Sequence, residues 1–105
     1  IFCLNPRNGR QVAIQVKTKR GGDLYYVPES VSPTDPPFVF VYLRPGGTVM
    51  YYVVPAADVA RISAAEREAY LAARPHVKPD QPRMVRVQAL EREEFRDRWD
   101  LLGLE

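Results

Sequence analysis

The sequence is poor in the residues that build disulfides and metal centres. It contains one cysteine, Cys3, and one histidine, His76. A single cysteine excludes an internal disulfide and a cysteine-rich zinc site, and a single histidine excludes a multi-histidine metal site. The sequence also has no apolar run near the roughly 20 residues that are needed to cross a bilayer, so it predicts no membrane partner.

The net charge of the chain is small, but the charges are unevenly distributed. Fifteen Lys and Arg against 13 Asp and Glu give a net charge of +2, which does not by itself indicate a nucleic-acid-binding protein. Between Arg7 and Arg20, however, there are five basic residues and no acidic one. This cluster is suited to binding a polyanion, or else it keeps an exposed hairpin soluble.

Length and composition predict one globular domain over residues 1–105. A chain of 105 residues with 46% hydrophobic residues can bury a single modest core. The first residue is Ile1, inside a short apolar run, and we interpret the chain as an N-terminally truncated domain. A cytoplasmic location is the default expectation for such a chain.

Turn-forming and alternating residues predict a β-hairpin at the start of the chain. The segment 5–9 is rich in turn formers and ends in Asn-Gly, so the hairpin should extend from the first residue to about Thr18. In its second strand Val12, Ile14 and Val16 alternate with more polar residues. We expect these three side chains to face the core.

The next segments predict a sheet with two central strands. Residues 24–27 form a third short strand candidate, and residues 28–37 hold four of the ten prolines and should be an irregular loop. Residues 38–43 and 50–54 are apolar on both faces, which is typical of strands covered on both sides. The tight connection 44–47 predicts that these two strands pair antiparallel.

Helices are expected after the strands. Residues 55–62 and 63–74 have helical character, with a break predicted at the Ser that begins the second segment. Residues 84–87 suit a short strand or an extended linker, and residues 90–102 suit a helix that Trp99 anchors to the core. The predicted fold class is therefore α+β, with a mixed, mostly antiparallel sheet followed by helices.

Two polar residues on the predicted hairpin form the main candidate site. Gln15 and Lys17 are two residues apart, so a strand places both side chains on one side, which we expect to be the polar side. A lysine held in this way can stabilise a developing negative charge, and an amide oxygen can bind a hard cation. Lys19 and Arg20 follow at once and are candidates for contact with a phosphate backbone.

The run Ile-Gln-Val-Lys-Thr at residues 14–18 resembles the second conserved strand of PD-(D/E)xK nuclease-like proteins. The rest of the chain resembles a small bacterial branch of that superfamily, with an Asn-Pro hairpin, the Gln-Val-Lys-Thr strand, two apolar strands at 38–43 and 51–55, a helix, and a Trp-Asp-Leu-Leu-Gly-Leu end at 99–104. The resemblance implies a restriction-endonuclease-like core that lacks its first helix.

The resemblance also implies roles for the two candidate residues. Lys17 matches the catalytic-type lysine, and Gln15 matches the second motif position, where it would help to hold Mg²⁺. The metal-binding Asp of the preceding strand has no match, because the first four residues contain no acid. We therefore expect the chain as given to be inactive, even if the intact protein cleaves nucleic acid.

Three functions remain open at this point. The first is a nuclease-like domain that acts on nucleic-acid phosphodiesters with a divalent metal through Gln15 and Lys17. The second is a domain of the same fold that binds DNA or RNA through Lys19 and Arg20 without cutting it. The third is a protein-interaction domain, for example a homodimer that associates through its sheet and so hides uncovered apolar strands.

Overall fold

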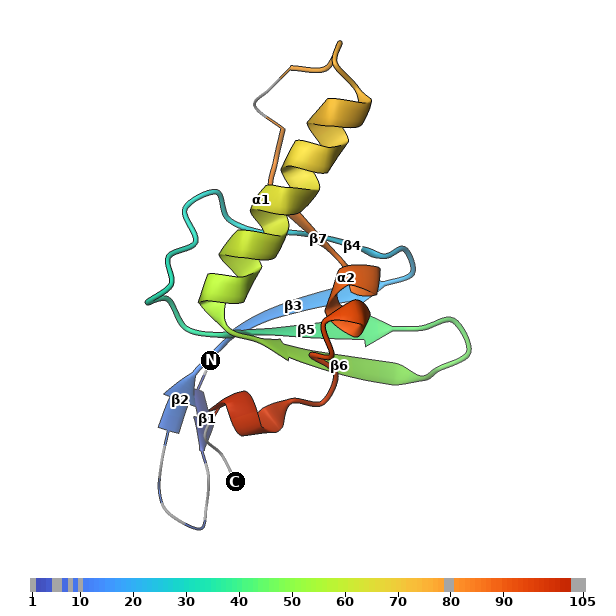
Figure 1. Ribbon diagram of the computed structural model, residues 1–105. Helices are drawn as coiled ribbons and strands as arrows, with labels where there is room; N and C mark the ends of the chain where they lie inside the picture. The colour runs from blue at the N-terminus through green and yellow to red at the C-terminus, as the bar shows by residue number, and fades with distance from the viewer. Residues whose placement is uncertain (1, 5–6, 8, 10, 79–80, 103–105) are drawn as a thin grey trace.

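A computed structural model gives the arrangement of the chain (Figure 1) and describes residues 2–4, 7, 9, 11–78 and 81–102. The elements are β1 (Phe2–Leu4), β2 (Gln11–Ala13), β3 (Gln15–Arg20), β4 (Leu24–Tyr26), β5 (Phe38–Leu43), β6 (Val49–Val54), α1 (Ala56–Ala73), β7 (Met84–Arg86), α2 (Val87–Arg92) and the 3₁₀ helix η1 (Trp99–Leu102). The predicted α+β class, with strands followed by helices, is confirmed.

The central sheet has three strands in the order β3-β5-β6. β5 pairs antiparallel with β6, as the tight connection between them predicted, whereas β3 runs parallel to β5. In the connection, Gly46 and Gly47 have φ values of 97° and 94°, which residues with a Cβ rarely adopt. Two small antiparallel pairs, β1-β2 and β4-β7, complete the sheet structure, so that three of the four described strand pairings are antiparallel.

The predicted hairpin is present, but its second strand is shorter than expected. β1 pairs with β2, and the turn between them lies mostly outside the described residues. The strand then breaks at Ile14, and from Gln15 onward the chain pairs with β5 instead of with the start of the chain. Pairing with β5 lets Ile14 pack with buried Val39 and Val53 of the central sheet.

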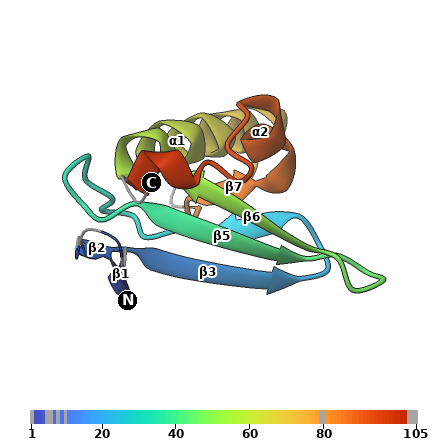
Figure 2. The same ribbon diagram turned by 90° about the horizontal axis from the view of Figure 1, so that it is seen from below.

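The main core lies on one side of the central sheet, which we call the core face. The buried side chains of Phe38, Phe40 and Tyr52 are on this side, and Val59 of α1 and Leu90 of α2 belong to the same cluster. Figures 1 and 2 show α1, α2 and the β4-β7 pair gathered over this side of the sheet. The strands β5 and β6 are fully buried only in the halves nearest α1, residues 38–40 and 52–54.

The opposite side of the sheet, which we call the opposite face, is less completely covered. Val39, Val53 and Leu102 form a second small cluster there with Ile14, and η1 provides the covering residue Leu102. Toward the far end of the sheet, the side chains of Val49 and Tyr51 remain more than a third exposed. The prediction of strands covered along their whole length on both faces is therefore only partly correct.

Helix α1 is continuous where a break was predicted. Ser63 lies inside it, fully buried, and its hydroxyl donates to the Ala60 carbonyl oxygen at 3.2 Å instead of capping a new helix. Ser63 continues the buried face that Val59 and Ile62 form just before it in the helix, so packing of this face outweighs the capping preference of serine. None of the helices in the described part of the chain combines the length and hydropathy needed to cross a bilayer.

The prediction of one helix over residues 90–102 is wrong. α2 ends at Arg92, and Glu94 and Asp97 adopt φ values of 62° and 55°, which a helix does not tolerate. The chain instead follows the edge of β6: Val53 N–H donates to the Phe95 carbonyl oxygen at 3.1 Å, and Asp97 N–H donates to the Tyr51 carbonyl oxygen at 2.9 Å. Hydrogen bonds to the backbone of β6 have thus replaced the intrahelical hydrogen bonds of these residues.

The predicted anchoring role of Trp99 is also not fulfilled in the expected way. Trp99 begins η1 and remains 38% exposed, with its ring 5.7 Å from that of Tyr51. The buried residue of η1 is Leu102. Because the chain turns at Asp97, the tryptophan rests on the opposite face beside Tyr51 instead of inserting into the main core.

Candidate functional site along strand β3

Strand β3 carries all the residues predicted for the site, and it forms one edge of the central sheet. In its pairing with β5, Gln15 is opposite Phe38, Lys17 is opposite Phe40, and Lys19 is opposite Tyr42. Residues directly opposite in a ladder point to the same side of the sheet. Gln15, Lys17 and Lys19 therefore share one side of the strand, and the predicted juxtaposition of the amide and the ammonium group is present.

The side on which these groups lie is the reverse of the prediction. Lys17 is on the core face, beside buried Phe40, whereas Val16 is on the opposite face and is 38% exposed. Alternation alone could not reveal this, because it defines two sides without saying which one is covered. At a sheet edge a lysine can lay its aliphatic stem against the margin of the core and keep its ammonium group in water, and Lys17 is accordingly half-buried.

Gln15 is held in place by the proline-rich loop before β5. Its side-chain amide donates from Nε2 to the Pro36 carbonyl oxygen at 3.0 Å, and its backbone N–H donates to the Pro37 carbonyl oxygen at 2.9 Å. The side-chain oxygen Oε1 is then the atom of Gln15 that remains for a ligand. The loop thus orients the amide at the start of β3, close to Lys17 on the same side.

The cationic groups of β3 differ in their ion pairing from most of the arginines in the rest of the described chain. The structure gives no ion pair to Lys17, Lys19 or Arg20 among the described residues, whereas arginines on and around the helices are paired with carboxylates. Asp23, the acid nearest to β3 in the sequence, lies 3.6 Å from Arg86 across the β4-β7 pair. β3 is therefore a row of positive charge that no acid of the described residues neutralises through an ion pair.

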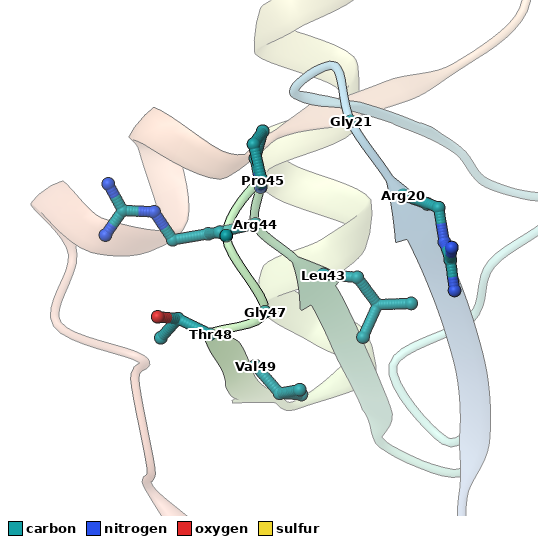
Figure 3. A pocket seen from close by; sticks show the side chains of 9 residues that line it. Arg20, Gly21, Leu43, Arg44, Pro45, Gly47, Thr48 and Val49 are labelled. Atoms are coloured by element: carbon teal, nitrogen blue, oxygen red, sulfur yellow. The ribbon is translucent and has the colours of Figure 1, made fainter.

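Arg20 is separated from the other three predicted residues. It points to the opposite face, where it lines a cavity of about 570 Å³ at the end of the sheet, together with Leu43, Arg44 and Val49. Figure 3 shows Arg20 and Arg44 on different sides of this hollow, with their guanidinium groups pointing away from each other. Arg44 was not predicted as a site residue; its place in an Arg-Pro-Gly-Gly turn was the only signal in the sequence.

The donor atoms present do not fit a resident Mg²⁺ ion. A magnesium site uses one or two carboxylates together with further oxygen ligands. Gln15 offers one neutral oxygen, and the described residues contain no cluster of three or more His, Cys, Asp or Glu side chains that could hold a metal. The described part of the chain therefore supplies the lysine and the amide of the expected site, but not its acidic ligand.

Comparisons with known proteins add no relative. The chain matches no family model, no curated protein and no solved structure.

Proposed function

We propose that this chain is a nuclease-like domain that engages a nucleic-acid backbone along β3 and that residues 1–105 bind this backbone without cleaving it. The observation that carries the proposal is the placement of Gln15, Lys17 and Lys19 on one side of an exposed sheet edge. The sequence resemblance to PD-(D/E)xK proteins supports the same assignment, with Lys17 in the position of the catalytic-type lysine.

The geometry of the row suits an extended polyanion. Side chains two residues apart on a strand are separated by about 6.6 Å, so the ammonium groups of Lys17 and Lys19 can contact neighbouring anionic groups along a chain. Because these lysines have no carboxylate partner in the described structure, binding breaks no existing ion pair. Lysine contacts to phosphate supply sequence-independent affinity, which decreases as the salt concentration rises.

Lys17 also has a position from which it can stabilise charge at a phosphate that is held beside it. Lys17 is opposite buried Phe40 in the ladder and is itself half-buried, and this partial burial limits the freedom of the ammonium group. Gln15, oriented by Pro36, offers an acceptor oxygen nearby. Among the described residues no carboxylate pairs with Lys17 and none belongs to a metal-binding cluster, so these two groups position a phosphodiester but do not activate a water. The proposal therefore separates binding from cleavage.

The test is salt-dependent binding of a fluorescent single-stranded oligonucleotide, measured by anisotropy. Lys17→Gln and Lys19→Gln should each weaken binding and each lower the slope of log K against log salt by about 0.7. Lys78→Gln, at an exposed lysine far from β3, is the matched control and should leave the slope unchanged. Equal slopes in all three variants would refute a backbone contact along β3.

A protein-interaction domain is the second candidate, and one observation favours it. Val16, Val49 and Tyr51 lie on the opposite face of the sheet and Trp99 rests beside Tyr51, and all four side chains are more than a third exposed. Exposed apolar side chains gathered on one face of a sheet are typical of association surfaces. Sedimentation velocity across a concentration series tests a homodimer, and Tyr51→Ser should abolish it if it forms through this face.

A further inference from the structure

The backbone of β3 has an edge that no other described strand pairs with. Gln15 N–H bonds to the Pro37 carbonyl oxygen at one end of the strand, and Gly21 N–H bonds to the Leu43 carbonyl oxygen just beyond the other end. Odd-numbered residues therefore direct their backbone groups toward β5. Because these groups alternate in direction along a strand, those of Val16, Thr18 and Arg20 point away from the sheet.

These outward groups have no partner strand among the described residues. β3 is the terminal strand in the order β3-β5-β6, and the described chain places no hydrogen-bonded strand on its other side. Figure 2 shows β3 on the outside of the sheet, with β5 and β6 on one side of it only. An unpaired six-residue edge of this kind is a template for an added strand.

The side chains along this edge determine what can be added. An incoming strand would place alternate side chains next to Lys17 and Lys19 on the core face, and the others next to Val16 on the opposite face. A second copy of β3 fits poorly, because an antiparallel two-fold pairing centred on Thr18 sets Lys17 opposite Lys19 of the second copy. Like charges directly opposite destabilise a sheet, whereas carboxylates at those positions complement the lysines.

We propose that the outer edge of β3 binds an extended acidic peptide as an added antiparallel strand. Carboxylate side chains of the peptide face Lys17 and Lys19, and its apolar side chains face Val16. The backbone groups of Val16, Thr18 and Arg20 supply up to three donors and three acceptors to it. This inference goes beyond the proposed function, because it depends on backbone groups that a phosphate backbone does not require.

The direct test uses the ¹⁵N-labelled chain and the synthetic peptide acetyl-(Glu-Val)₃-amide, with amide hydrogen exchange measured by NMR. In the free chain the amides of Val16 and Thr18 should exchange rapidly, and those of Lys17 and Lys19 slowly. Saturating peptide should slow exchange at Val16, Thr18 and Arg20 by about tenfold or more, because these amides then become hydrogen-bonded. No slowing at millimolar peptide would overturn the proposal.

Two pairs of peptides separate strand addition from simple charge attraction. In an antiparallel arrangement the valine residues of the peptide direct their N–H groups toward β3, so N-methylation of the valines should abolish binding, whereas N-methylation of the glutamates should not. Acetyl-(Lys-Val)₃-amide should not bind. Equal binding of the two N-methylated peptides, or binding of the lysine peptide, would contradict the arrangement.

Variants of the chain distinguish this proposal from nucleic-acid binding. Thr18→Pro removes an outward N–H and no bond to β5, so it should abolish peptide binding and leave oligonucleotide binding within about twofold. The double change Lys17→Gln, Lys19→Gln should weaken peptide binding about fivefold, and Lys78→Gln should have no effect. If Thr18→Pro fails to fold, the N-methylated peptides still decide the question with the unchanged chain. A homodimer formed through β3 in the free chain would overturn the assignment to an acidic peptide.

Discussion

Tyr25 should make the free energy of unfolding of the domain decrease as the pH rises above about 10. Its side chain is 3% exposed, its ring lies 4.9 Å from that of Phe40, and its hydroxyl donates to the Val41 carbonyl oxygen at 2.8 Å. Burial is the main reason that the pKa of Tyr25 is raised well above its ordinary value of 10.0, and nearby Tyr52 and Tyr42 raise this pKa further. The phenol therefore keeps its proton in the folded chain at a pH where the unfolded chain loses it.

The substitution Tyr25→Phe removes this hydroxyl and leaves the ring in place. At pH 8 the lost hydrogen bond should lower the free energy of unfolding by about 1 kcal/mol. Above pH 10 the folded wild type binds more protons than its unfolded state, so its stability falls with rising pH, by at most about 1.4 kcal/mol per pH unit from this group. Phenylalanine has no such loss, so the variant should equal the wild type near about pH 10.7 and be the more stable of the two at pH 11.

Urea unfolding followed by circular dichroism at several pH values between 8 and 11 measures this difference. Comparing the two proteins at each pH removes the contributions of the ionisable groups that do not interact with Tyr25, because both proteins share them. Tyr26→Phe, at an exposed position of the same strand, is the control and should stay within about 0.5 kcal/mol of the wild type at pH 8. A gap between wild type and Tyr25→Phe that stays constant from pH 8 to 11 would refute the reasoning.

Two further predictions concern the segment that replaces the expected last helix. Glu94 has a φ of 62°, so Glu94→Gly should raise the free energy of unfolding by about 0.5 kcal/mol, because relief of the left-handed strain exceeds the extra chain entropy of glycine. Glu94→Val should lower it, and the opposite order in urea unfolding would contradict this account. Trp99→Ala should cost about 1–2 kcal/mol in the same assay, below the roughly 3–5 kcal/mol of a buried tryptophan, because Trp99 is 38% exposed. A loss above about 3 kcal/mol would mean that Trp99 is a core residue after all.

The first half of the chain was largely predictable because its signals are local. Apolar runs bounded by turn formers located β4, β5 and β6, and the glycine-containing connection predicted the antiparallel pairing of β5 with β6. Alternation placed Gln15 and Lys17 on the same side of a strand, which is a property of the strand alone. These features depend on residues no more than a few positions apart.

The predictions failed where backbone groups from distant segments compete for the same chain. The helical pattern of residues 90–102 was sound as a pattern, but the edge of β6 offered bonds to residues 95–97 that the pattern could not anticipate. The serine in the middle of α1 shows the converse, since buried neighbours kept the helix intact against a local capping signal. In both places tertiary contacts outweighed local preference.

The order of the elements from β4 to α1, the α+β class and the shared side of Gln15 and Lys17 follow from local sequence, because steric alternation and turn geometry act between near neighbours. Only the tertiary structure decided that this side adjoins the core, that Arg20 lies on the other side, and that β3 is an edge strand parallel to β5. Those outcomes depend on which faces the helices cover and which strand lies next to which. Contacts between residues far apart in the chain set them, and no short stretch of sequence encodes them.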